Sequence, residues 1–292
     1  MAHSFSGQTA VITGGASGIG AALARAAASR GMNMLIADVD EAGLRATAES
    51  CPSVEVHMMR VDVSDAADVE RMADQAYARF GVVDLLCNNA GIVPGGRHRA
   101  VWEYEVQDWH WAFDVNVLGI VNGLRSFVPR MLEADRPAHI LNTTSVSGFI
   151  SGAGSPVYGA SKHAAVRVTE ALYASLLERD APIGVSMLCP GLVNTRIFET
   201  ERVRPAHLRS AAADIEEPEA LRSIAAGGAD PETVARQAFE GVEAKRFYIF
   251  TSDNFDESIE ARTQAILSRS NPQFDGFTAM SRRDAENPVS RY

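Results

Sequence analysis

The chain has 292 residues, of which 46% are hydrophobic, so it is long enough for one large domain and leaves little for a second. Thirty-seven acidic against 27 basic side chains give a net charge of −10, which disfavours nucleic acid or an anionic membrane as a partner. The first residues lack the basic and apolar regions of a signal peptide, and no apolar run reaches bilayer length, so a cytoplasmic location is expected.

The first predicted elements are a strand, a glycine-rich turn and a helix. Residues 9–12 are apolar and predict a short buried strand, and residues 21–29 predict a helix. Glycines in the turn let the backbone approach an anion closely, and the unpaired amide groups and dipole of the helix face its negative charge. We therefore expect the turn to hold a dinucleotide pyrophosphate, through Gly14, Ser17, Gly18, Ile19 and Gly20.

A second apolar strand, residues 32–37, ends in Asp38. A carboxylate at this distance from the glycine-rich turn would accept hydrogen bonds from the adenosine ribose. It would repel a 2′-phosphate, and its expected neighbours Ser17 and Val39 offer no positive charge. The sequence therefore predicts NAD rather than NADP as the cofactor.

Apolar strands alternate with amphipathic helices along the rest of the chain. This pattern predicts an α/β fold, a doubly wound seven-stranded parallel sheet with helices on both faces and the cofactor across the carboxyl ends of the strands. Ser64 is expected to cap a helix from Asp65 to Phe80, which Gly81 would end. The expected strands lie near residues 9–13, 32–37, 54–61, 82–88, 138–144, 183–189 and 246–251.

Three side chains in the second half of the chain can form an acid–base site. Tyr158 and Lys162 are four residues apart, which places them on one face of a helix, and Ser145 lies upstream at the end of a strand. A free tyrosine has a pKa of about 10, and a charge about 4 Å away supplies roughly 4 kcal/mol at an effective dielectric of about 20. We expect Lys162 to lower the pKa of Tyr158 toward neutrality, which would make the phenolate a base for alcohol oxidation.

These motifs together resemble the short-chain dehydrogenase/reductase family over about residues 5 to 250. The resemblance implies hydride transfer, a homo-oligomer that is a tetramer or a dimer, and catalytic roles for Ser145, Tyr158, Lys162 and Asn116. In that family the residue matching Asn116 holds a proton-relaying water. The implied adenine contacts are Asp62 and Val63, and further implied cofactor contacts are Asn89, Ala90, Gly91, Pro190, Gly191, Val193 and Thr195.

Each of these side chains also has a purely structural interpretation. Ser145 would satisfy backbone groups at a strand end, Asn116 would bend its helix, Lys162 would be a solvated charge, and Asp62 would cap the turn before Ser64. The glycine-rich turn favours the functional interpretation for Ser145, Tyr158 and Lys162, and it leaves both interpretations open for Asn116 and Asp62.

Two segments carry the expectations about substrate. Residues 95–111 hold aromatic side chains that would either line a pocket for a ring-bearing substrate or pack in the core or a subunit contact. Residues 196–228 are rich in charge and predict a lid, whose arginines would either contact a substrate carboxylate or, more simply, be solvated and pair with acidic residues 214–219. The aromatic residues are Trp102, Tyr104, Trp109 and Trp111, and the basic ones are Arg196, Arg202, Arg204, His207 and Arg209.

The C-terminal part suggests a narrower likeness. Arg204-Pro205, residues 230–232, residues 247–249 and a helix around residues 259–262 look like the family branch that contains aryl-alcohol Cα-dehydrogenases. Hydroxysteroid dehydrogenases share the core motifs equally well. We expect one domain over residues 1–270 and a tail over residues 271–292 that is either mobile or in contact with another subunit.

Metal chemistry is not expected. Cys51, Cys87 and Cys189 are far apart and look like small core residues in a reducing compartment. The histidines, among them His98 and His110, show no ligand spacing.

The sequence thus predicts an NAD-dependent oxidoreductase that transfers hydride between nicotinamide and a secondary alcohol or ketone, with an aromatic or polycyclic small molecule as one option. The alternatives are a hydroxysteroid dehydrogenase, a nucleotide-sugar dehydratase or epimerase that retains its cofactor, and a non-catalytic NAD-binding regulator.

Overall fold

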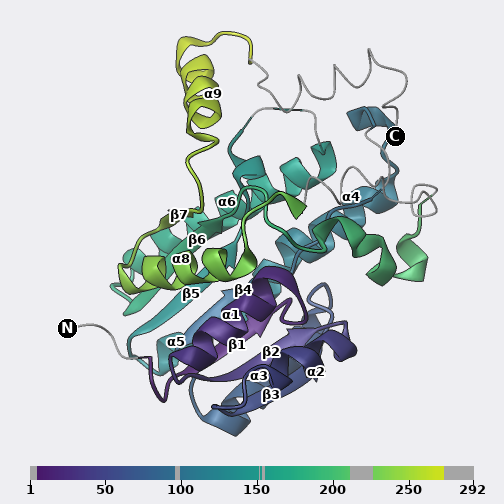
Figure 1. Cartoon of the computed structure of the whole chain (residues 1–292). Coiled ribbons are helices and arrows are strands. Elements are labelled where there is room, and N and C mark those ends of the chain that lie inside the picture. The colour runs from purple at the N-terminus through teal and green to yellow at the C-terminus, as the bar shows by residue number, and fades with distance from the viewer. Residues whose placement is uncertain (1–4, 96–98, 151, 153–154, 211–225, 273–292) are drawn as a thin grey trace.

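The computed structural model describes residues 5–95, 99–150, 152, 155–210 and 226–272. Seven parallel strands form one sheet in the order β3-β2-β1-β4-β5-β6-β7, which confirms the predicted doubly wound α/β fold (Figure 1). The central strands read as nearly continuous apolar runs because both faces of the sheet are covered. The strands are β1 (Thr9–Thr13), β2 (Asn33–Asp38), β3 (Val56–Arg60), β4 (Leu85–Asn88), β5 (Ala138–Thr143), β6 (Ile183–Cys189) and β7 (Tyr248–Phe250).

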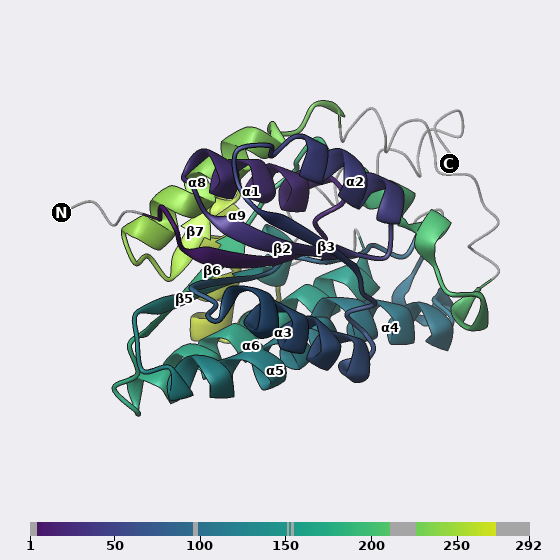
Figure 2. The same cartoon turned by 90° about the horizontal axis from the view of Figure 1, so that it is seen from below.

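Helices cover both faces of this sheet (Figure 2). One layer holds α1 (Gly18–Ser29), α2 (Glu41–Glu49) and α8 (Pro231–Glu243), and the other holds α3 (Ala66–Phe80), α4 (Val106–Phe113), α5 (Gly119–Glu133) and α6 (Pro156–Leu177).

Two apolar cores follow from the alternation of side chains along each strand. Ile12 of β1 packs in one core with Phe239 of α8, while its neighbour Val11 packs in the other with Phe127 of α5. The three cysteines are free and buried, as expected of core residues.

The chain reverses its direction of winding at β1. From β1 the strand order runs outward to β2 and β3 on one side and to β4 through β7 on the other. The carboxyl ends of β1 and β4 therefore border the crevice in which doubly wound sheets bind their ligands.

The start of α3 corrects one prediction. Asp65 rather than Ser64 is the N-cap, and its side chain accepts a hydrogen bond from Ala67 N at 2.8 Å. Ser64 instead donates its backbone N–H and its hydroxyl to Asp62 Oδ1, at 3.0 and 2.6 Å. The helix does end at Gly81, whose φ of +75° suits a residue without a side chain.

The last described helix, α9 (Asp256–Ser268), stands apart from the sheet in Figure 1. Of its side chains only Ala265 is buried, while Ile266 and Leu267 are exposed. Most of the predicted tail, residues 273–292, lies outside the described residues. None of the described helices has both the length and the apolar character that a bilayer crossing requires.

Candidate active site

A cavity of about 460 Å³ lies along the carboxyl ends of the strands. It runs from the glycine-rich turn to the segment η4 (Ile197–Val203). All the residues predicted to contact the cofactor line it, together with the predicted catalytic residues except Asn116. They are Gly14, Ser17, Gly18, Ile19, Gly20, Asp38, Asp62, Val63, Asn89, Ala90, Gly91, Ser145, Tyr158, Lys162, Pro190, Gly191, Val193 and Thr195.

The glycine-rich turn has no room for side chains. A Cβ atom on Gly20 would lie 2.0 Å from Gly14 O, and one on Gly14 would lie 2.8 Å from Ala90 Cα. Gly14 and Gly18 also adopt φ values of +69° and +52°. The turn leads directly into α1, whose first amide groups have no partner within the helix. This cradle therefore fits the pyrophosphate of a dinucleotide.

Thr13, to which the sequence analysis gave no role, holds the cradle to β4. Its Oγ1 accepts hydrogen bonds from Asn89 N at 2.9 Å and Ala90 N at 3.1 Å. Asn89 Nδ2 in turn donates to Thr13 O at 3.0 Å, and Thr143 Oγ1 donates to Asn89 Oδ1 at 3.1 Å. The signal in the sequence was the position of Thr13, between the end of the first strand and Gly14.

Asp38 lies at the end of β2 and faces the same cavity. Its Oδ2 accepts from Ala16 N at 3.1 Å and its Oδ1 from Asp40 N at 3.0 Å. Burial raises the pKa of this carboxyl group, although these backbone hydrogen bonds oppose the rise. Asp62 lines the cavity, where the predicted adenine contact would lie. It also caps the turn to Ser64, as in the structural interpretation.

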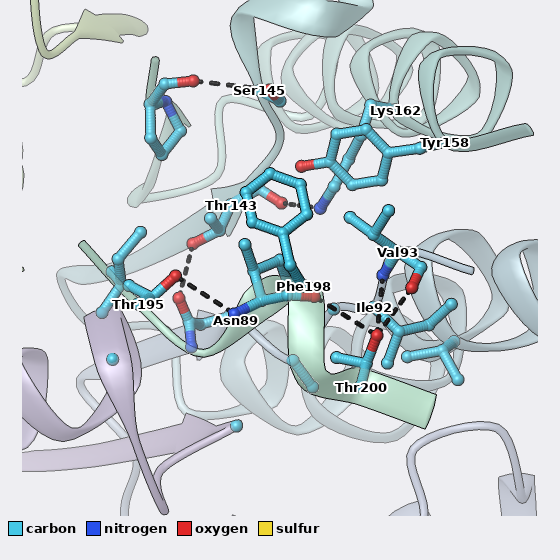
Figure 3. A pocket seen from close by; sticks show the side chains of 18 of the residues that line it. Asn89, Ile92, Val93, Thr143, Ser145, Tyr158, Lys162, Thr195, Phe198 and Thr200 are labelled. Carbon is cyan, nitrogen blue, oxygen red and sulfur yellow. Dashed lines mark hydrogen bonds between the residues drawn. The ribbon is translucent and has the colours of Figure 1, made fainter. Parts of the chain in front are cut away.

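Tyr158, Lys162 and Ser145 come together in the lining of the cavity (Figure 3). Tyr158 and Lys162 project from α6, and Lys162 Nζ lies 5.7 Å from the centre of the Tyr158 ring. Ser145 follows β5, and a hydrogen bond from its side chain favours the ionised form of Tyr158. Ser145 Oγ also accepts from Ser147 N at 3.1 Å, so it has the predicted structural role as well.

The prediction that Lys162 alone brings the pKa of Tyr158 toward neutrality is wrong for this structure. Burial raises the pKa of Tyr158 to about 12, and the Ser145 hydrogen bond opposes this only in part. Lys162 is itself 3% exposed, and burial lowers its pKa to about 8. Its Nζ is directed to Thr143 O at 3.1 Å rather than to the phenol oxygen.

Asn116 lies in a π-helical segment, Asp114–Leu118, between α4 and α5. Its side chain is fully buried, accepts from Ile92 N at 2.8 Å, and donates to Ile92 O and Ser161 Oγ, both at 2.9 Å. A Cβ on Gly91 would lie 3.3 Å from both Asn116 Oδ1 and Lys162 Nζ. The amide therefore lies behind the catalytic residues and joins the loop after β4 to α6.

The predicted aromatic cluster divides into two parts. Tyr104 and Trp111 line the cavity, whereas Trp102 is 83% exposed and Trp109 packs beside Phe113. Phe198 of η4 also projects into the cavity (Figure 3). The substrate side is therefore largely aromatic and aliphatic.

Four of the five basic residues of the predicted lid are exposed, as predicted for solvated side chains: Arg196, Arg202, His207 and Arg209. Arg196 Nε lies 2.6 Å from Glu199 Oε2, and Arg202 Nη1 lies 3.0 Å from Asp40 Oδ2. Arg204 is buried and contacts two carboxylates, Asp108 and Glu201, that lie outside the acidic half of the lid. The sequence did not indicate these partners, and residues 211–225 lie outside the described residues.

Residues 8–205 match the model of the short chain dehydrogenase family. The chain belongs to this family. A short-chain dehydrogenase/reductase from Burkholderia phymatum, solved in complex with NAD, is 40% identical with a TM-score of 0.89, over 94% of this chain and 99% of that one. The 1-deoxy-11-beta-hydroxypentalenate dehydrogenase of Streptomyces exfoliatus is 38% identical over 88% of this chain and 86% of its own length.

The predicted likeness to the Cα-dehydrogenase branch is confirmed as well. The C alpha-dehydrogenase of Sphingobium sp. (strain NBRC 103272 / SYK-6) is 36% identical over 90% of this chain and 86% of its own length. This short-chain dehydrogenase gathers no group of three or more potential metal-ligating side chains in the part of the chain that the structure describes.

Proposed function

We propose that this protein is an NAD-dependent oxidoreductase that interconverts a secondary alcohol and the matching ketone. The observation that supports this most directly is the convergence of Ser145, Tyr158 and Lys162 on the cavity that also contains the glycine cradle. A hydroxyl, a phenol and a buried ammonium at one point provide the groups that proton transfer to and from a substrate oxygen requires.

The bound nicotinamide would supply hydride transfer and, when oxidised, a positive charge. Tyr158 takes the hydroxyl proton of the alcohol, and Ser145 holds the substrate oxygen. The raised pKa of Tyr158 favours the neutral phenol, which carries the proton that a ketone takes up, and Tyr158 needs further positive charge to act as a base. Lys162 contributes part of that charge and orients the cofactor ribose. Asn116 holds the helix that carries these residues and, as the family resemblance implies, a water that relays protons outward.

The substrate we propose is bulky, apolar and ring-bearing. Tyr104, Trp111 and Phe198 line the cavity on the substrate side. Arg196 and Arg202 also line it, but each is paired with a carboxylate, Glu199 and Asp40 respectively. The related dehydrogenase named for 1-deoxy-11-beta-hydroxypentalenate supports a substrate that carries a hydroxyl group. A hydroxysteroid is the second candidate, because a flat polycyclic alcohol would pack against the same aromatic side chains.

The preference for NAD rests on Asp38. Its carboxylate faces the cavity at the end of β2, where it would accept hydrogen bonds from ribose hydroxyls and repel a 2′-phosphate. Arg202, the nearby cation, is paired with Asp40. The relative from Burkholderia phymatum that was solved with NAD supports the same choice.

The proposed reaction is tested by following reduced-cofactor absorbance with NAD or NADP and a panel of benzylic, steroidal and aliphatic secondary alcohols. We expect turnover with NAD, and Tyr158→Phe to lower kcat by about 10²- to 10⁴-fold while NAD still binds. Tyr173→Phe is the matched control, because Tyr173 lies on the same helix and is 44% exposed. Turnover with NADP but not with NAD would contradict the proposal that Asp38 selects NAD. NAD binding without any turnover would favour the regulator.

The cytoplasmic location and the homo-oligomer remain predictions from the sequence.

A further inference from the structure

The aromatic side chains of Tyr104, Trp111 and Phe198 form what we call the substrate wall of the cavity. A buried carboxylate, Asp108 of α4, lies behind Tyr104 and Trp111. Its side chain is 0% exposed. Arg204 Nη2 lies 2.8 Å from its Oδ1 and Arg99 Nη2 lies 3.2 Å from its Oδ2. Ser210 Oγ donates to Oδ1 at 2.9 Å. Because a buried charge is costly without a partner, these groups fix one another's positions.

Each of the two arginines also covers an aromatic ring. Arg204 Cζ lies 4.8 Å from the centre of the Trp111 ring, and Arg99 Cζ lies 4.0 Å from that of Tyr104. Both rings line the cavity. One carboxylate thus orients two guanidinium groups, and each of these holds one ring of the substrate wall.

Arg204 also connects Trp111 to the segment 201–208. Its Nε donates to Leu208 O at 2.7 Å, and its Nη1 donates to Glu201 Oε1 at 3.1 Å. Glu201 Oε1 in turn accepts from Gly95 N at 2.7 Å, in the segment that follows β4. The four charged side chains, Arg99, Arg204, Asp108 and Glu201, balance in sign. Among the described residues, one network of side chains therefore joins the rings of Trp111 and Tyr104 to the segment 201–208.

We propose that Asp108 is a positioning residue that sets the shape of the substrate wall and thereby the selectivity for bulky, ring-bearing alcohols. The proposal rests on the alcohol dehydrogenase activity proposed above. Asp108 acts through Arg204 and Arg99 on Trp111 and Tyr104. A displaced ring changes how a large substrate is held, but it leaves Ser145, Tyr158 and the glycine cradle in place.

The variant Asp108→Asn keeps the size of the side chain and removes its charge. We expect KM for a two-ring benzylic alcohol to rise by about tenfold to a hundredfold, with kcat, NAD affinity and the KM for propan-2-ol nearly unchanged. Arg204→Lys keeps the buried charge and loses the planar fork, and it should shift KM in the same direction. Asp74→Asn is the matched control, because it breaks an ion pair with Arg130 in which Asp74 is 61% exposed.

A second readout does not depend on turnover. In a Trp102→Phe/Trp109→Phe background the remaining Trp111 reports on the wall, and Asp108→Asn should increase its quenching by acrylamide while Asp74→Asn does not. An equal rise in KM for small and bulky alcohols, or unchanged quenching of Trp111, would overturn the proposal. A wild-type protein that oxidises no alcohol would reject the proposed function, and the quenching of Trp111 would still decide the role of Asp108.

Discussion

Lys162 keeps an ammonium group where the surrounding protein disfavours its charge. It is 3% exposed, and burial lowers its pKa to about 8 from 10.5. The unfolded chain therefore binds this proton more tightly than the folded protein does. Below pH 8 the buried charge lowers the free energy of unfolding by its full amount. This loss of stability decreases as the pH rises from 8 to 10.5. The proposed role of Lys162 in turnover would therefore be maintained at the expense of stability.

Lys162→Met should accordingly raise the free energy of unfolding at pH 7 while it abolishes turnover. We expect a gain of about 1–3 kcal/mol. The upper limit is the free energy that corresponds to a pKa lowered from 10.5 to about 8, and the lower limit allows for the lost hydrogen bond to Thr143 O. Denaturant unfolding at pH 7 and pH 10.5 measures it, and the gain should vanish at the higher pH. Lys245→Met, at the exposed second lysine of the chain, is the control.

At the scale of single residues, sequence reasoning succeeded where side chains are close along the chain. A spacing of four placed Tyr158 and Lys162 on one face of α6, as the structure shows. It failed for the ion pair of Asp108 and Arg204, because these residues come from distant segments and nothing in the sequence pairs them. It also underestimated desolvation, which depends on the whole fold and raises rather than lowers the pKa of Tyr158.

Among the elements, the glycine-rich turn was predicted most fully. Gly14, Gly18 and Gly20 were expected to allow a close approach, and the contacts of an added Cβ atom give the physical reason. The end of α3 at Gly81 was also correct, but its start was not. Ser64 and Asp65 are adjacent residues that can both cap a helix, so composition alone could not choose between them.

Gly20→Ala should therefore damage the cradle rather than the fold. The new Cβ would lie 2.0 Å from Gly14 O, so the turn must open and NAD affinity should fall by at least about tenfold. Gly159→Ala is the control, because among the described residues its Cβ would approach Ser147 O alone, at 3.7 Å. Titration of cofactor fluorescence measures both variants. Equal NAD affinities would show that the cradle does not bind the pyrophosphate.

For the whole molecule, the topology was predictable because seven apolar segments alternate with helices, and parallel strands joined in this way leave few alternatives.

The pH dependence of stability could not be predicted from the sequence, since it depends on buried side chains such as His139 in β5. His139 is 9% exposed, and its Nε2 lies 2.8 Å from Ser186 Oγ. Burial lowers its pKa to about 4, so the folded protein holds it neutral.

This histidine should make the fold sensitive to acid. The unfolded chain takes up the proton first, so stability is lost as the pH falls from 6.5 and the loss is complete below about pH 4, where it reaches about 3 kcal/mol. His139→Gln should reduce the pH dependence of the unfolding free energy between pH 6.5 and pH 4. The substitution His110→Gln, at an exposed histidine, should not. Parallel pH profiles for wild type and His139→Gln would contradict this assignment.

The network around Asp108 has a consequence for how such enzymes diverge. It contacts the rings of Trp111 and Tyr104 and the segment 201–208 through side chains that include none of Ser145, Tyr158 and Lys162. Substitutions that remodel the wall can therefore accumulate over evolutionary time without altering the groups that handle protons.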